Sequence, residues 1–281
     1  MGAFPSAIEC TIDNWIDFFV AQVDVILLAG DRGPGDPLAE RAGVAGKTLV
    51  PVAGQAMLTR VLICVGRWPR LGRIILVVPS LHAYDRAIDE AGIELRRLIR
   101  IAPESSPSLS VLKALKAAGP SWPVVLATAD HPLLDPDWLD QMVAQADNGD
   151  LGVGLTRWEA VMQRFPGSRR TRYRFSDGDI CGTNLFVFHT PAADRILQTW
   201  RKVEQERKRP WKIISLLGLT NLARYFAGVL SLNAGFAALS QRLGIDIQPV
   251  MLPDPLTAVD VDKAEDLALV EQVFRERDAP C

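Results

Sequence analysis

The sequence has few cysteines and almost no excess charge of either sign. Its 281 residues include four cysteines, at positions 10, 64, 181 and 281, which form neither a C-x-x-C pair nor a zinc-binding spacing. This pattern predicts unpaired thiols in a reducing compartment. The formal net charge is −2, so the chain lacks the overall basic excess typical of nucleic-acid-binding proteins. We expect no nucleic-acid partner.

Only one long stretch is nearly free of charge. Between positions 213 and 239 the single charged residue is Arg224, which is long enough to raise the question of a membrane span. Glycine and asparagine interrupt the stretch at positions 218, 221, 228, 233 and 235, and this density favours two or three short helices. No basic segment followed by an apolar one opens the chain, so we expect no signal peptide and a cytoplasmic protein.

Apolar runs that alternate with helical patterns predict an α/β fold. Such runs are typical of parallel strands that are buried on both faces, and helices between them indicate βαβ units. The fold class expected is therefore a mainly parallel central sheet flanked by helices. Strands are predicted at 25–28, 73–78, 123–128, 151–155, 185–188, 250–252 and 259–261, and helices at 57–68, 110–118, 134–146, 191–207 and 264–277.

The chain shows no repeat and no low-complexity linker, which favours one domain. Residues 1–22 are expected to form a peripheral N-terminal segment, and residues 23–281 the domain itself. The helical region at about 191–247 is interpreted as an insertion in this domain, a helical elaboration of its C-terminal part.

The first predicted strand runs into a glycine-rich loop that suits a triphosphate. Glycines at positions 30, 33 and 35 allow backbone N–H groups to turn toward an anion, while Arg32 and Lys47 supply positive charge. The loop contains neither a G-x-x-x-x-G-K-[ST] motif nor a G-x-G-x-x-G motif. It therefore indicates phosphate binding by another architecture.

Two acidic segments are candidates for a metal site. Asp130 follows the strand at 123–128, and ligands of open α/β sheets bind outside the carboxyl ends of strands. Asp260 and Asp262 are two residues apart on a predicted strand, so their side chains should face the same side. Carboxylates are the ligands that Mg²⁺ prefers. His131 is interpreted as a packed loop residue.

The segment Leu28-Ala29-Gly30, together with Arg32, Lys47, Pro51-Val52 and Gly54, resembles the signature of the MobA-like nucleotidyltransferases. That family belongs to a larger group with a Rossmann-like GT-A-type fold. The resemblance implies that the first loop, with Leu28, Ala29, Gly30 and Gly33, wraps a nucleoside triphosphate. It also implies that Arg32 and Lys47 contact phosphates and act in catalysis.

The acidic segments share this resemblance. The D-x-P-L-L segment that begins at Asp130 is similar to the family's metal-binding aspartate motif, and Val259–Leu267 is similar to its D-x-D-T-P-E-D-L ending, with Lys263-Ala264 in place of Thr-Pro. The implied site holds Mg²⁺ on Asp130 and Asp262, and the share of Asp260 stays open. Glu265 and Asp266 are expected to cap the last helix.

Two further segments resemble substrate-binding parts of these enzymes. Residues 105–115 are similar to the base and ribose segment of cytidylyltransferases, so Ser108 and Ser110 are candidate nucleotide contacts and CTP is favoured over GTP. Either serine could instead cap the helix. Residues 181–186 resemble the acceptor-lining G-x-N-L-F segment, with Gly182 and Asn184 as candidates, although a plain turn into a strand is the alternative.

Two clusters of basic residues allow two interpretations. They are a solvated basic face, or they recognise a phosphorylated acceptor, because arginine matches phosphate oxygens. Basic residues beside apolar helices also suit an anionic membrane surface, which suggests a lipid or head-group precursor as acceptor and peripheral contact with the inner face of the membrane. The clusters comprise Arg164, Arg169, Arg170, Arg172 and Arg174, and Arg201, Lys202, Arg207, Lys208, Arg209 and Lys212.

The expected activity is therefore transfer of a nucleoside monophosphate from an NTP to a phosphorylated acceptor, with release of pyrophosphate. Three alternatives remain at this point: a GT-A glycosyltransferase that consumes a nucleotide sugar, a guanylyltransferase of a cofactor pathway, and a nucleotide-binding protein without catalysis.

Overall fold

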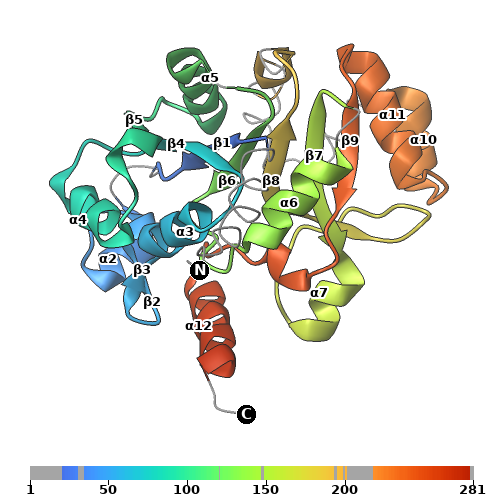
Figure 1. Ribbon diagram of the computed structural model, residues 1–281. Helices are drawn as coiled ribbons and strands as arrows, with labels where there is room; N and C mark the ends of the chain where they lie inside the picture. The colour runs from blue at the N-terminus through green and yellow to red at the C-terminus, as the bar shows by residue number, and fades with distance from the viewer. Residues whose placement is uncertain are drawn as a thin grey trace, which may run out of the picture.

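A seven-stranded sheet runs through the centre of the molecule, with helices on both of its faces (Figure 1). The computed structural model describes residues 21–30, 35–119, 121–146, 149–192, 195–198, 200 and 218–278. The strand order is β5-β4-β1-β6-β8-β7-β9. The strands are β1 (Val23–Leu28), β4 (Leu71–Val77), β5 (Leu98–Ile101), β6 (Val124–Thr128), β7 (Leu151–Arg157), β8 (Ile180–Phe188) and β9 (Ile247–Met251).

The sheet is mainly parallel, as the sequence predicts. β5, β4, β1 and β6 are parallel neighbours, and so are β7 and β9. Only β8 runs against its neighbours β6 and β7. Consequently β4, β1 and β6 end at the same edge of the sheet, which is the edge where ligands of open α/β sheets bind.

Alternation along the strands divides the interior into two cores. Val25 and Leu27 of β1 belong to one buried cluster, and Ile26 between them belongs to the other. Successive side chains of a strand point to opposite faces, so one apolar strand supplies both cores. The first core packs residues of α3 (Met57–Gly66), α4 (His82–Ala91), α6 (Pro136–Gln145) and α12 (Ala264–Asp278) against the sheet. The second packs residues of α5 (Pro107–Ala118) and α11 (Leu232–Leu243).

Side chains cap the starts of four helices. Asp36, Ser106, Asp135 and Ser231 accept backbone N–H groups at the starts of α2, α5, α6 and α11. Short elements complete the chain: the hairpin β2 (Pro51–Val52) and β3 (Gln55–Ala56), and the 3₁₀ helices η1 (Lys47–Leu49), η2 (Leu95–Arg97) and η3 (Pro255–Ala258). The helices are α2 (Pro37–Ala42), α3 (Met57–Gly66), α4 (His82–Ala91), α5 (Pro107–Ala118), α6 (Pro136–Gln145), α7 (Trp158–Arg164), α10 (Leu219–Phe226), α11 (Leu232–Leu243) and α12 (Ala264–Asp278).

Two local predictions are wrong. Residues 259–261 form no strand but a loop after η3, and this loop is anchored by the N–H of Val261, which donates to the carbonyl of Asp130 at 2.8 Å. The cap of α5 is Ser106 rather than Ser108 or Ser110, because Pro107 takes the first helical position and places both later serines inside the helix.

The weakly charged stretch becomes separate short helices where it is described. α10 and α11 are divided by residues 227–231, and they gather at the β9 side of the sheet (Figure 1). In the described ranges no helix combines the length and apolar character needed to cross a membrane. Of the helix predicted at 191–207, residues 195–198 and 200 are helical and the remainder lies largely outside the described residues, as do residues 1–20.

A glycine in β7 makes room for an irregularity in β8. A Cβ at Gly154 would overlap the hydroxyl of Thr183 and lie 2.9 Å from the carbonyl oxygen of Leu185. We predict that Gly154→Ala lowers the free energy of unfolding by about 1–3 kcal/mol, because the backbone of β8 must shift. Urea denaturation measures this change. Gly182→Ala, where a Cβ meets open space, is the matched control, and equal losses in both variants would contradict the explanation.

Candidate active site

Three carboxylates converge beyond the end of β6. One oxygen of each of Asp130, Asp260 and Asp262 lies within 4.8 Å of the others. Asp130 follows β6 directly, and the other two lie in the loop between η3 and α12. The hydrogen bond from Val261 to the carbonyl of Asp130 joins these two segments. The cluster thus forms without the strand on which the sequence analysis relied.

Lys47 supplies a cation at this cluster. Its Nζ lies 2.7 Å from Asp130 Oδ2 and 2.5 Å from Asp262 Oδ1, and its side chain is only 12% exposed. Burial acts to lower the pKa of Lys47, but the charges of Asp130 and Asp262 outweigh it and raise the pKa above its ordinary value. Lys47 is therefore a charged ammonium that binds two of the three carboxylates.

Asp260 is held by different partners. Its Oδ1 accepts from Nη1 of Arg170 at 2.5 Å, and its Oδ2 accepts from Nδ2 of Asn184 at 3.0 Å. Burial, and then the negative charge of Asp130, raises the pKa of Asp260 to about 6. Whether Asp260 belongs to the acidic site stays open from the sequence alone; in the structure its carboxylate lies with the other two.

Asn184 reaches Asp260 because β8 is irregular at this point. The pairing of β7 with β8 shifts between Val153 and Leu155, and Asn184 has a φ of +56°, in the left-handed region. Bulges of this kind redirect side chains and are common beside active sites. Gly182 on the same strand is exposed, with open space around its Cα. The predicted acceptor segment thus lies next to the acidic cluster.

The acidic cluster has the donors of a divalent cation site. Asp130 Oδ1 is buried and has no hydrogen-bond partner among the described residues, although its other oxygen binds Lys47. A buried, unpaired carboxylate oxygen is costly unless a cation contacts it. Three carboxylates are also the hard oxygen ligands that suit Mg²⁺. The donor set fits the predicted metal, with Asp130 and Asp262 joined by Asp260.

The end of β1 offers mainly backbone groups, and β1 is the neighbour of β6 in the sheet. The N–H of Ala29 donates to the carbonyl of Val77 at 2.8 Å, and Leu28 accepts from the N–H of Ala129. Gly30 is exposed at the start of the loop, and a Cβ there would touch Pro103 at 3.4 Å. Arg32 and Gly33, both predicted to bind phosphates, lie outside the described residues.

Ser108 and Ser110 are buried and engaged within the start of α5. The hydroxyl of Ser110 donates to the carbonyl of Ser106 and accepts from the N–H of Glu104. The Oγ of Ser108 lies 3.0 Å from the Oγ of Ser106. Both serines therefore shape the turn before α5, and their predicted contact with a nucleotide stays a prediction.

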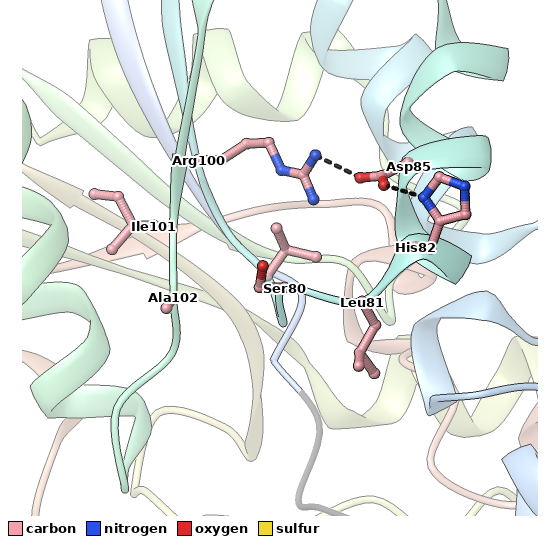
Figure 2. A pocket seen from close by; sticks show the side chains of 8 residues that line it. Ser80, Leu81, His82, Asp85, Arg100, Ile101 and Ala102 are labelled. Carbon is pink, nitrogen blue, oxygen red and sulfur yellow. Dashed lines mark hydrogen bonds and ion pairs between the residues drawn. The ribbon is translucent and has the colours of Figure 1, made fainter.

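A pocket of about 490 Å³ opens at the carboxyl ends of β4 and β5. Figure 2 shows the guanidinium of Arg100 directed at Asp85, whose other oxygen bonds the ring of His82. Ser80, Leu81 and Ala102 also line the pocket. Sequence patterns do not reveal this pocket, because its polar residues resemble ordinary surface charges. The position of Ser80 and Leu81 soon after the apolar strand that ends at Val77 was the available signal.

Most arginines of the first basic cluster form ion pairs with carboxylates. Arg164 pairs with Glu276, Arg172 pairs with Asp179 and lies over the ring of Trp158, and Arg170 pairs within the acidic site. Arg169 and Arg174 are exposed and form no side-chain ion pair with described residues. The second basic cluster, between 201 and 212, lies outside the described residues.

His131 is a packed residue, as predicted. It is 1% exposed, its Nε2 donates to the carbonyl of Leu256 at 3.2 Å, and its ring lies against Trp138. Burial lowers its pKa. It therefore stays neutral and is not directed into the cluster as a base.

Solved structures of other proteins share the fold of this chain. A hypothetical transferase from Thermus thermophilus matches with a TM-score of 0.73 and 28% identity, covering 88% of this chain and 99% of its own. Two others match in fold, each covering 92% of this chain and 99% of its own. They are 4-diphosphocytidyl-2C-methyl-D-erythritol synthase from Anaerococcus prevotii (TM-score 0.54, 13% identity) and CMP:2-keto-3-deoxy-manno-octonic acid synthetase complexed with CTP (TM-score 0.56, 12% identity).

No curated protein matches the chain. A family model does: residues 25–215 match the MobA-like NTP transferase domain. The match begins in β1 and includes the first loop, Lys47, Asp130 and Asn184. The chain belongs to the MobA-like NTP transferases and is a nucleotidyltransferase.

Proposed function

We propose that this protein transfers a nucleoside monophosphate from CTP to a phosphorylated acceptor and releases pyrophosphate. The observation that carries the proposal is the meeting of Lys47 with Asp130, Asp260 and Asp262 beside the end of β1. A cation that is bound to carboxylates next to a glycine-rich loop can neutralise phosphate oxygens while the carboxylates hold a metal.

The order of the strands in the sheet supports one orientation of the bound nucleotide. β1 lies between β4 and β6, so the end of β1 lies between the pocket at β4 and β5 and the acidic cluster beyond β6. Ligands of open sheets bind across the carboxyl ends of the strands. The nucleoside would occupy the pocket, the triphosphate would cross the first loop with Gly30, Arg32 and Gly33, and the reacting phosphorus would face Asp130.

The reaction needs positioning more than acid–base chemistry. An oxygen of the acceptor phosphate attacks the α-phosphorus of the NTP, the bond to the bridging oxygen breaks, and pyrophosphate leaves. The nucleophile is already anionic, so no general base is required, which agrees with the packed position of His131. Lys47 would contact the phosphates as their charge grows. Mg²⁺, when bound by Asp130 and Asp262 together with Asp260, supplies further neutralisation of phosphate oxygens.

The choice of CTP rests on the resemblance of residues 105–115 to cytidylyltransferases. The pocket offers Ser80, Asp85 and Arg100 as donors and acceptors for a base. On the acceptor side, Asn184 bonds Asp260 of the cluster, Gly182 is an exposed residue of the same strand, and exposed Arg169 is available for the acceptor's phosphate. A screen of four NTPs against phosphorylated acceptors distinguishes CTP from GTP, and therefore tests the alternative of a cofactor guanylyltransferase.

We further propose that the acceptor is a lipid or head-group precursor and that this otherwise cytoplasmic protein touches an anionic membrane. The support is the exposed apolar surface at α10, where the side chains of Leu219, Phe226 and Val229 are 87%, 69% and 57% exposed. Arg224 of the same helix is also exposed. Apolar residues beside positive charge are typical of interfacial helices.

Flotation with liposomes tests the membrane contact. We predict that the protein floats with vesicles that contain phosphatidylglycerol and stays in the soluble fraction with pure phosphatidylcholine, because charge and apolar insertion are both needed. Phe226→Ser should abolish flotation. The control is Leu95→Ser, since Leu95 is 80% exposed on η2, away from α10. A wild-type protein that never floats would remove the membrane from the proposal.

Pyrophosphate release tests the activity itself. The assay contains Mg²⁺, CTP and an acceptor that the wild-type protein uses as substrate. Lys47→Met should lower the rate by about 10²–10³-fold, which is the usual cost of removing one contact to the charge that develops on the phosphates. Lys116→Met, on the exposed side of α5, is the matched control. Near-normal turnover by Lys47→Met would contradict the assignment. Release of a nucleoside diphosphate from a nucleotide sugar would instead favour a glycosyltransferase, and nucleotide binding without any turnover a non-catalytic protein.

Metal affinity should depend on the protonation of Asp260. Its pKa is raised to about 6, so protons compete with a metal there, and Mn²⁺ affinity is expected to increase as pH rises through about 6. Without metal the effect on stability has the opposite sign. The contribution of Asp260 to the free energy of unfolding is present below its ordinary pKa of 3.8 and is lost as pH rises through about 6.

Mn²⁺ titrations by electron paramagnetic resonance, and urea denaturation in EDTA, measure the two dependences. Asp260→Asn cannot titrate at this position and should flatten both profiles relative to the wild type. If the variant and the wild type show the same pH dependence, another group is responsible.

A further inference from the structure

Arg170 binds two acidic residues, Asp260 and Asp266, that are distant from it in the sequence. It lies between α7 and β8, and its side chain is only 9% exposed. Nη1 donates to Asp260 Oδ1 at 2.5 Å, and Nη2 donates to Asp266 Oδ1 at 2.8 Å. Nη2 also lies 3.3 Å from the carbonyl oxygen of Asp260. One guanidinium therefore holds both the side chain and the backbone of Asp260.

The contact with Asp266 extends this hold to Asp262. The second oxygen of Asp266 accepts the N–H groups of Asp262 and Lys263, at 3.1 and 3.0 Å. The backbone that carries the Asp262 side chain is thus fixed through Asp266, and the Asp260 side chain is fixed directly. Arg170 contacts neither Asp130 nor Lys47 by any hydrogen bond or ion pair between described residues.

The position of Arg170 does not suit an acceptor phosphate. Both terminal nitrogens are directed at carboxylates, and its Nε is buried without a hydrogen-bond partner in the described part of the chain. Arg169 beside it is exposed and remains available to a phosphate. The basic segment therefore contains two different kinds of arginine.

We propose that Arg170 is a positioning residue, whose guanidinium fork sets Asp260 directly, and Asp262 through Asp266, in the geometry that a divalent cation needs. The inference rests on the proposed function, which makes these carboxylates the metal site. A planar fork can bind two carboxylates and a carbonyl at fixed angles, whereas the single ammonium of a lysine cannot. Groups that orient metal ligands in this way typically contribute 10–100-fold to metal affinity.

The sign of the change in affinity distinguishes positioning from simple charge. If Arg170 acted only as a positive charge near the cluster, its removal would make the site more negative and strengthen cation binding. If it positions the carboxylates, its removal weakens cation binding, because Asp260 and Asp262 lose their fixed orientation. The two roles therefore predict opposite results.

The experiment is a Mn²⁺ titration of the full chain by electron paramagnetic resonance, at a pH well above 6. We expect Arg170→Gln to weaken Mn²⁺ binding about 10–100-fold, and Arg170→Lys to restore only part of it. The matched control is Arg172→Gln, which removes an arginine of the same loop that pairs with Asp179 and lies over Trp158. It should bind Mn²⁺ as the wild type does. CTP binding in EDTA should be unchanged in all three variants.

Each outcome bears on the inference. Unchanged or tighter Mn²⁺ binding by folded Arg170→Gln would overturn it, as would full restoration by Arg170→Lys, since the planar fork would then not be needed. Should Arg170→Gln fail to fold, Asp266→Asn breaks the other end of the fork and should also weaken Mn²⁺ binding; wild-type affinity in that variant would overturn the inference. A wild-type protein that binds neither Mn²⁺ nor CTP would refute the proposed function as well, whereas failure of the inference alone leaves wild-type binding intact.

Discussion

Mutual repulsion among three carboxylates is the constraint around which this site is organised. Ionised groups a few ångströms apart, and partly removed from water, are unfavourable unless cations lie among them. Lys47 neutralises Asp130 and Asp262 from one side, and Arg170 neutralises Asp260 from the other. Each cation comes from a different part of the chain, so the site exists only when the whole domain is folded.

The sheet brings these distant segments together. β6 delivers Asp130 to the edge at which β1 and β4 also end, and the loop after η3 is joined to it by one backbone hydrogen bond. The antiparallel strand β8 adds Asn184 at its irregular position, which Gly154 of the neighbouring strand accommodates. Loops supply the chemistry, and the buried strands fix where those loops begin.

Sequence patterns reveal the parts of this arrangement that depend on local chemistry. Continuous apolar runs predict β1, β4 and β6, and an acidic residue just after such a run identifies Asp130. Asp260 and Asp262 were expected together because of a strand that does not exist; they converge instead because Asp266 and Arg170 hold their loop. The two aspartates therefore lie close together as predicted, although the strand predicted to bring them together is absent.

Patterns of this kind do not predict contacts between residues that are distant in the sequence. The pairing of Arg170 with Asp260 spans 90 positions, and that of Lys47 with Asp262 spans 215. A basic run such as 164–174 looks uniform in sequence, yet its members differ because one is buried at the site, others pair with nearby acids, and two face solvent. Burial and tertiary pairing decide these roles, and neither follows from residue type and spacing.

The ammonium of Lys47 has a consequence for how the protein depends on its surroundings. Small metal-binding domains that fold only around their ion unfold when a chelator removes it. This protein carries its own cation at the acidic cluster and has two apolar cores besides, so we expect its fold to persist when divalent ions are removed. Under the proposed function, metal scarcity would silence the enzyme while leaving it folded, and activity would return as soon as the ion does.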